Sequence, residues 1–326
     1  MIATYIRIGA LLLAALSFAL PAAALAQAFP SKPVKIVVGF VPGGGSDIMA
    51  RVVSARLAEA NGWSVVVENR PGANANIAAE YVAKAPADGY TVLMMSVAHA
   101  MSKPVFARSL KYDLERDLQP LIALCTVPNV IVVPAASAFR GLGELLAEAR
   151  ARPGALSYGS SGIGGVEHVA GEMLASMAGI RLLHVPYKGG AAAAQDLVSG
   201  VTSFGLNTMP AAAPFIKSGK LRVLAVTTEK RQPILPETST VAEAGVPGYA
   251  FSTWYGMMVP AGTPREAVQV LHREILKSLG APEVRERFAA LGADPLGGTP
   301  EEFNAFIRTE VAKYSRVVKD VNLQAE

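Results

Sequence analysis

Apolar residues along the chain follow two alternating patterns, short β-branched runs and longer stretches with helical spacing. The run VKIVVGF (34–40) predicts a strand, and the apolar stripe from Ile48 to Leu57 predicts a helix that ends at Gly62. Further strands are expected at 64–70 and 91–97, with a helix at about 74–85 between them. This β-α-β-α-β order predicts parallel strands with helices on both faces.

The same alternation starts again near residue 125, which predicts a second α/β unit. The expected strands are 155–161, 180–187, 201–207 and 221–228, and the expected helices are 141–151, 166–178, 190–199 and 210–218. After Pro264 the chain is expected to be helical to its end. Thr299 supplies an N-cap for the last helix, Pro300 its first position and Glu302 a capping-box carboxylate.

Length adds a division into domains to this picture. A chain of 326 residues exceeds the size at which a single core usually divides, so two domains are expected. Domain 1 is predicted to comprise 27–125 and 252–326, and domain 2 to comprise 126–251. The two crossovers, near 124–133 and 249–260, are expected to form a hinge.

The first 26 residues have the pattern of a secretory signal peptide. Arg7 precedes an apolar stretch from Ile8 to Leu20, and Ala24-Leu25-Ala26 forms a small-x-small cleavage signal, so cleavage near Ala26 is expected. The alternative is a membrane anchor, but the apolar stretch is shorter than the roughly 20 residues that span a bilayer. No later stretch could span a membrane. A periplasmic location is therefore predicted.

Two glycine-rich loops lie where a predicted strand becomes a helix. In the first, Gly43, Gly44 and Gly45 precede Ser46 and Asp47, with Ser46 as the expected N-cap. Glycine permits positive φ angles and close approach to bare backbone. A helix N-terminus with free N–H groups is a site for a carboxylate or phosphate.

The second loop repeats this arrangement in SYGSSGIGGVEHVAGEM. It contains Ser160, Ser161, Gly162, Gly164 and Gly165. Since functional loops of α/β domains lie at the carboxyl ends of parallel strands, both helix N-termini are expected to face one cleft. The alternative is that both loops are merely tight βα turns.

Catalytic and metal-binding templates do not fit the sequence. Gly45 is followed by Ser46-Asp47 where a phosphate-binding loop needs lysine, and neither glycine loop has the dinucleotide or nucleophile-elbow spacing. The four histidines form no metal-binding spacing; His99 and His168 lie near strand ends and could touch a ligand, whereas His184 and His272 are expected to be structural. No enzyme activity, cofactor or metal is predicted.

Charge and cysteine content argue against a nucleic-acid-binding protein and against a disulfide-bonded one. The formal net charge is only +4, and the basic residues are scattered, so a nucleic-acid partner is not expected. The single cysteine, Cys125, lies in an apolar run and is expected to be buried, and one cysteine allows no internal disulfide.

Five motifs, in order over essentially the whole mature chain, resemble those of the Bug-type solute receptors of tripartite tricarboxylate transporters. They are GFVPGGGSDIMAR, VENRPGANANIAAEYVAKAPADGYTVL, HVPYKGG, IKSGKLRVLAV and LPETSTVAEAGVPGYAFSTWYGMMVPAGTP. The resemblance implies a two-domain, type II-like periplasmic-binding-protein fold with mostly parallel sheets joined by a two-crossover hinge. It implies a monomeric receptor that captures a small carboxylate and delivers it to membrane transporter subunits. An exported hydrolase or transferase using the same cleft, and a receptor that signals to a membrane sensor, remain as alternatives.

The resemblance also nominates ligand contacts by motif. These are Gly43, Gly44, Gly45, Ser46, Asp47, Ser160, Ser161, Gly162, Gly164 and His168, and the predicted site is completed by Ser96, His99, Gly165 and Asn207.

Three positions depart from the family pattern. Gly165 stands where the family commonly has Ser or Thr, Asn207 where it commonly has Asp, and Asn74-Ala75 where it has a glycine pair. A neutral Asn207 favours a plain carboxylate or an amide over an amino acid, unless this side chain only caps a turn.

Overall fold

The sheet contains two sets of parallel strands, as the alternating pattern predicts. The protein is described by a computed structural model that covers residues 29–321 and 323. The first set has the order β2-β1-β3 and the second the order β7-β5-β6. The strands are β1 (Val34–Val38), β2 (Val65–Asn69), β3 (Thr91–Ser96), β5 (Ser157–Ser160), β6 (Leu183–Pro186) and β7 (Phe204–Thr208).

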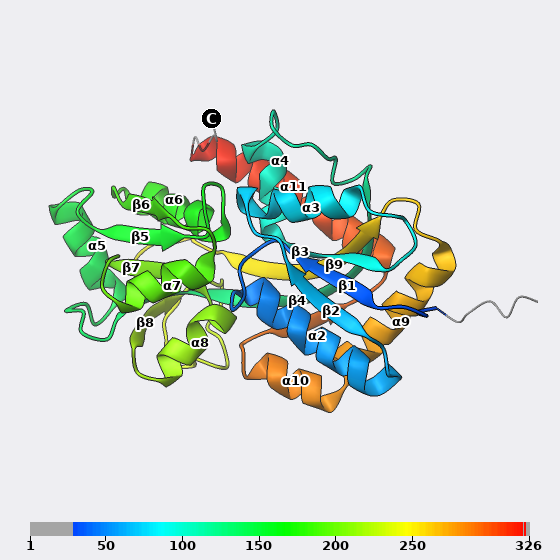
Figure 1. The fold of residues 1–326 in the computed structure, drawn as a ribbon. Helices are drawn as coiled ribbons and strands as arrows, with labels where there is room; N and C mark the ends of the chain where they lie inside the picture. The colour runs from blue at the N-terminus through cyan, green and yellow to red at the C-terminus, as the bar shows by residue number, and fades with distance from the viewer. Residues whose placement is uncertain (1–28, 322, 324–326) are drawn as a thin grey trace, which may run out of the picture. The chain divides into compact units, whose positions relative to one another are not determined.

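Two long antiparallel strands, β4 (Leu118–Pro134) and β9 (Ser252–Pro260), connect these sets (Figure 1). β9 lies between β3 and β4, and its pairing with β4 runs from Leu118 opposite Pro260 to Pro128 opposite Ser252. From Asn129 onward β4 pairs instead with β7 and with β8 (Leu221–Val226). The apolar run from residue 121 is thus one continuous strand that passes from one part of the sheet to the other.

Helices flank both parts of the sheet, and all of them except α4 lie in regions predicted to be helical (Figure 1). They are α2 (Gly45–Asn61), α3 (Asn76–Ala83), α4 (Val97–Val105), α5 (Leu142–Ala151), α6 (Val166–Ala178), α7 (Gly190–Val198), α8 (Met209–Lys217), α9 (Arg265–Gly280), α10 (Pro282–Ala289) and α11 (Pro300–Asp320).

Two elements differ from the prediction. α4 was not expected, and the C-terminal part is not wholly helical, because β10 (Asp294–Gly297) pairs with β4. α4 follows β3 directly, so its start is hidden in the apolar strand pattern, and β10 has only four residues, too few to show a periodicity. The capping box of α11 is confirmed, since Thr299 N–H donates to Glu302 Oε2 at 2.8 Å and Glu302 N–H to Thr299 Oγ1 at 3.2 Å.

Aromatic packing fixes α11 against β9. Trp254 of β9 is buried between Phe303 and Phe306 in edge-to-face geometry, with ring centroids 6.0 and 5.1 Å away. Its indole N–H donates to Glu310 at 2.8 Å. Full burial of such an aromatic side chain contributes about 2–3 kcal/mol, so the last helix is part of the core that carries β9.

Buried polar contacts mark the point where β4 changes partners. Thr253 Oγ1 donates to Asn129 Oδ1 at 2.7 Å, and Thr227 Oγ1 lies 2.9 Å from the Asn129 carbonyl oxygen and 2.8 Å from that of Phe251. These side chains join β4, β9 and the segment after β8 at one place.

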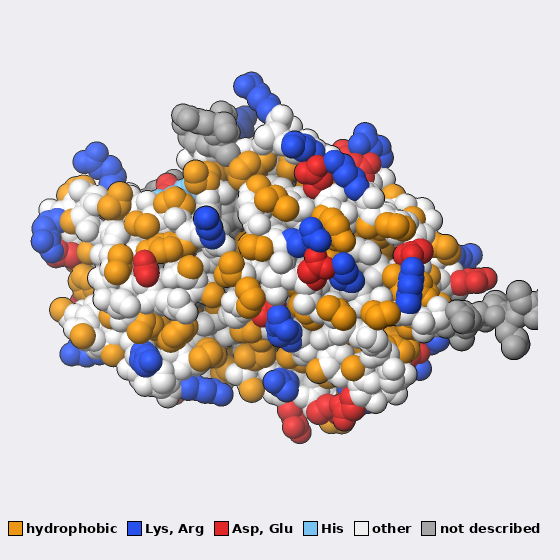
Figure 2. Space-filling model, in the orientation of Figure 1, with side chains coloured by type: hydrophobic (Ala, Val, Ile, Leu, Met, Phe, Trp, Pro, Cys, Tyr) orange, Lys and Arg blue, Asp and Glu red, His pale blue; other side chains and the backbone are white. Residues whose placement is uncertain are grey.

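Charged side chains are dispersed, as the sequence predicts. Figure 2 shows Lys and Arg mixed with Asp and Glu over the visible face, with no continuous basic stripe. Cys125 is buried, as expected. The predicted signal peptide, residues 1–26, lies outside the described residues. Within 29–321, no helix has both the length and the apolar character needed to cross a membrane.

Candidate functional site

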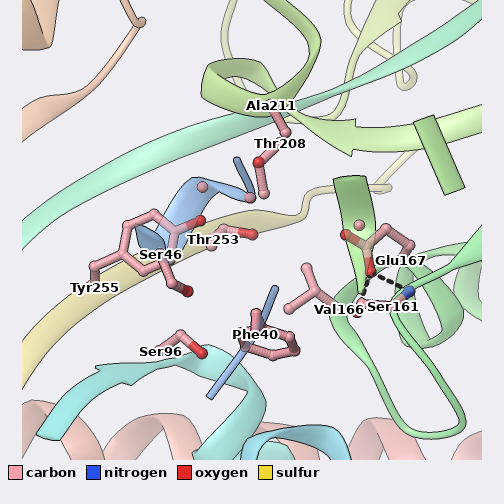
Figure 3. A pocket seen from close by; sticks show the side chains of 13 residues that line it. Phe40, Ser46, Ser96, Ser161, Val166, Glu167, Thr208, Ala211, Thr253 and Tyr255 are labelled. Carbon is pink, nitrogen blue, oxygen red and sulfur yellow. Dashed lines mark hydrogen bonds between the residues drawn. The ribbon is translucent and has the colours of Figure 1, made fainter. Parts of the chain in front are cut away.

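A small polar pocket lies where the loop after β1, the end of β3, the loop after β5 and the strand β9 meet (Figure 3). The cavity of about 30 Å³ has room for about two water molecules. Of the predicted contacts it contains Gly44, Gly45, Ser46, Ser96 and Ser161. The pocket therefore joins both glycine loops, which lie more than a hundred residues apart in sequence.

The first glycine loop presents backbone donors to this pocket. α2 begins at Gly45 with Gly44 as its N-cap, so the expectation that Ser46 caps the helix is wrong. The N–H groups of Gly44, Gly45 and Ser46 have no acceptor within the described part of the chain. A 17-residue helix thus points its unpaired N–H groups and the positive end of its dipole into the pocket.

Asp47 does not line the pocket; its carboxylate stabilises the first glycine loop through hydrogen bonds. Its carboxylate accepts hydrogen bonds from Gly43 N–H at 3.0 Å, from Asn69 Nδ2 at 2.9 Å and from Arg51 Nε at 2.9 Å. Burial raises the pKa of Asp47, but the hydrogen bonds from Arg51, Gly43 and Asn69 outweigh it and lower the pKa below its usual value. Gly43, with φ +84°, and Asp47 shape the loop that places the donors.

Tyr255 of β9 closes the pocket against the start of α2. A Cβ built on Gly45 would lie 2.2 Å from Tyr255 Oη and 2.8 Å from Thr208 Oγ1, so glycine is required here for the close approach. Burial raises the pKa of Tyr255, and its hydroxyl interacts with those of Thr208 and Ser46. Tyr255 therefore stays a neutral hydroxyl donor or acceptor at the pocket wall.

The second glycine loop contributes Ser161 to the pocket. Its other predicted residues make hydrogen bonds within the loop and to the start of α6. Gly162 lines a neighbouring hollow and donates its N–H to Ser160 Oγ at 3.1 Å. Gly164 N–H donates to His168 Nδ1 at 3.0 Å. Four predicted ligand contacts therefore do not line this pocket, and their role in binding stays a prediction: Ser160, Gly162, Gly164 and His168.

The three departures from the family pattern each have a structural counterpart. A Cβ on Gly165 would lie 2.6 Å from Ser161 Oγ, so the Ser161 hydroxyl occupies the space that a larger residue would need. The Asn207 side chain lies against Gly205 on the same strand and does not line the pocket. Asn74 has φ +52°, and its Nδ2 donates to Gly164 O at 3.0 Å, which joins two segments 90 residues apart.

Three histidine side chains, those of His99, His168 and His184, lie outside the lining of the pocket. His99 accepts from Ser96 N–H at 3.1 Å, and burial lowers its pKa to about 4. His168 and His184 stack with ring centroids 3.7 Å apart, and His184 Nε2 lies 2.6 Å from Ser160 Oγ. Burial is the main cause that lowers the pKa of His168 to about 3 and of His184 to about 4.

The stacked histidines are expected to make the protein less stable in acid. Between pH 6.5 and about 4 the unfolded chain binds protons at these sites that the folded chain does not, so the free energy of unfolding falls as the pH falls. His184→Phe keeps a ring stacked on His168 but removes one titrating group. It should therefore reduce the slope of the free energy of unfolding against pH by at most about 1.4 kcal/mol per pH unit. Urea denaturation at pH 7, 5.5 and 4.5 measures both slopes, and equal slopes would contradict the expectation.

Four pocket residues with polar side chains were not singled out from the sequence. Thr208, Thr253 and Tyr255 lie on strands in apolar runs, and Glu167 reads as an ordinary first-turn acid of α6. Among the residues that line this pocket Glu167 carries a charge, and Lys, Arg and His are absent from the lining. Within the described residues, no cluster of His, Cys, Asp or Glu could hold a metal ion.

A polar pocket at the carboxyl ends of parallel strands, between two α/β units joined by long crossing strands, is the architecture of two-domain periplasmic solute-binding proteins. The chain belongs to the tripartite tricarboxylate transporter receptor family, whose model matches residues 49–323. The family resemblance predicted from the sequence is thereby confirmed.

Relatives match over most of their length. The chain is 40% identical to the UPF0065 protein in the tcbD-tcbE intergenic region of Pseudomonas sp. strain P51, covering 92% of this chain and 89% of that protein. It is 35% identical to protein BugT of Bordetella pertussis, covering 90% of this chain and 91% of that protein.

Solved structures share the fold. Rpa4515 of R. palustris with adipate has a TM-score of 0.88 and 38% identity, covering 91% of this chain and 100% of that one. MatC of Rhodopseudomonas palustris with bound malate has a TM-score of 0.83 and 27% identity, covering 89% of this chain and 100% of that one. The predicted fold class is confirmed.

Proposed function

We propose that this chain is a periplasmic receptor that captures a small carboxylate, or a related amide, and delivers it to a tripartite tricarboxylate-type membrane transporter. The observation that carries the proposal is the set of unpaired N–H groups at Gly44, Gly45 and Ser46, which open into a buried polar pocket. Each charge-assisted hydrogen bond to a carboxylate contributes roughly 1.5–3 kcal/mol. Adipate and malate in two related structures support the same ligand class.

The receptor is proposed to close around its ligand by movement of two domains. Domain 1 comprises 27–125 and 252–326, domain 2 comprises 126–251, and β4 and β9 form the hinge between them. The change of β4 partners at Asn129 supports this division. The pocket is too small for a dicarboxylate to enter as it stands, so capture requires the domains to part.

Export, a monomeric state and the absence of catalysis belong to the same proposal. The N-terminal sequence supports export with cleavage near Ala26. An exported enzyme would need a nucleophile next to a base, and the one serine–carboxylate pair at the pocket, Ser161 with Glu167, has no histidine beside it in the lining. Binding without turnover fits this arrangement better.

Calorimetric titration of the protein that begins at residue 27 tests the function. The panel contains mono- and dicarboxylates, aromatic acids and amides, with and without EDTA. One ligand bound per chain, unaffected by EDTA and recovered unchanged by mass spectrometry, is the expected result. Conversion of the ligand, or no binding of any acid or amide, would overturn the proposal.

A further inference from the structure

Glu167 places an acidic side chain in a pocket that otherwise attracts anions. It is the second residue of α6 and is 5% exposed. Ser161 N–H donates to its Oε2 at 3.0 Å, and the Ser161 hydroxyl donates to the same oxygen. One carboxylate oxygen is therefore fully occupied by the second glycine loop.

The other oxygen, Oε1, has no hydrogen-bond donor among the described residues. It lies 3.1 Å from where a Cβ on Gly190 would be, beside the start of α7. Figure 3 shows this oxygen directed towards the side of the pocket where Thr253 and Tyr255 lie. This oxygen is therefore available to accept a hydrogen bond from a ligand in the pocket.

The two ends of the pocket consequently have opposite polarity. In Figure 3, Ser46 and Glu167 lie on opposite sides, the first at the N–H donors of α2 and the second presenting an acceptor. No cation of the lining compensates Glu167. A ligand with a carboxylate at each end would bring its second carboxylate against Glu167, where like charges repel each other in a largely buried site.

We propose that the receptor selects monocarboxylates that carry a nitrogen donor, an ammonium or amide N–H group, at the far end, and that Glu167 is the residue that sets this preference. The inference rests on the proposed carboxylate-binding function. The ligand carboxylate meets Gly44, Gly45 and Ser46, and the nitrogen donates to Glu167 Oε1. Once the domains have parted to admit it, one such molecule would meet the unpaired N–H groups at one end and the Glu167 carboxylate at the other.

A matched ligand series tests the selectivity. Calorimetry compares ω-amino acids of three to six carbons with dicarboxylates of equal length, on the wild type and on Glu167→Gln. We expect the wild type to bind the amino acid at least tenfold more tightly than the matching dicarboxylate. Glu167→Gln keeps an acceptor for Ser161 but removes the charge, so it should weaken amino-acid binding about 10- to 100-fold and strengthen dicarboxylate binding.

Glu144→Gln is the control, because Glu144 is an exposed first-turn acid of α5 outside the pocket. Circular dichroism verifies that both variants fold. A wild type that prefers dicarboxylates, or an unchanged preference in folded Glu167→Gln, would overturn the inference while leaving carboxylate binding intact. If neither series binds, the inference fails, and the broader acid and amide panel decides whether the proposed function fails with it.

Discussion

Replacing Gly45 with valine is expected to abolish ligand binding in a protein that still folds. A Cβ at this position would lie 2.2 Å from Tyr255 Oη and 2.8 Å from Thr208 Oγ1, so the added side chain holds β9 and the end of β7 away from the start of α2. Losing one or two charge-assisted hydrogen bonds weakens affinity about 10- to 1000-fold. Calorimetric titration with the tightest ligand of the panel measures the change.

Two companion variants separate this explanation from a general cost of removing glycine. Gly143→Val places the same side chain in the first turn of α5, where a Cβ meets no atom within 4 Å, and should leave affinity unchanged. Gly44 has φ −77° and a Cβ there would be 3.6 Å from Val41 O, so Gly44→Ala should fold normally and test the donor loop alone. Near wild-type affinity in folded Gly45→Val would disprove the role assigned to the first glycine loop.

Asp47→Ala is expected to destabilise the protein by about 2–5 kcal/mol. The substitution removes the carboxylate that accepts from the part-buried donors of Gly43 and Asn69, and a hydrogen bond to a charged group contributes roughly 1.5–3 kcal/mol. The pKa of Asp47 is lowered in the folded state, so its contribution is present above the usual aspartate pKa and is lost as the pH falls. Urea denaturation at pH 7 and pH 3 should show a smaller difference from wild type at pH 3.

Glu59→Ala provides the matched control on the same helix. Glu59 is exposed and its ion pair with Arg56 is long, at 3.7 Å, so its removal should change stability by less than about 0.5 kcal/mol. If Asp47→Ala cost no more than Glu59→Ala, the hydrogen bonds behind the first glycine loop would not stabilise it.

Local sequence patterns located most of the elements and both glycine loops. Strand and helix periodicity depends on residues near one another, and so α2, α6 and the capped start of α11 were predicted closely. The loops themselves were recognisable because each places a glycine cluster at a strand-to-helix junction, where positive φ angles or a close approach to the backbone are needed. Gly44, Gly45, Ser46 and Ser161 do line one pocket.

The rest of the pocket depends on tertiary structure that local patterns do not contain. Tyr255 reaches the start of α2 only because β9 is inserted beside β3, and Thr208 only because β7 ends opposite β4. Asn207 was expected to discriminate among ligands, yet the neighbouring Thr208 lines the pocket. Adjacent residues of a strand face opposite sides of the sheet. An error of one residue in the register therefore assigns the pocket position to Asn207 instead of Thr208.

The position of β9 has a consequence for the order in which the chain can fold. β9 is hydrogen-bonded between β3 and β4, although about 150 residues separate it from β3 in the sequence. A nascent chain that ends before Ser252 therefore leaves facing edges of β3 and β4 unpaired, and it lacks α11, which buries Trp254. Residues 32–125 cannot complete their sheet until nearly the whole polypeptide has been made. The central position between β3 and β4 is thus expected to be filled only late in synthesis, after the strands β5 to β8 have already been made.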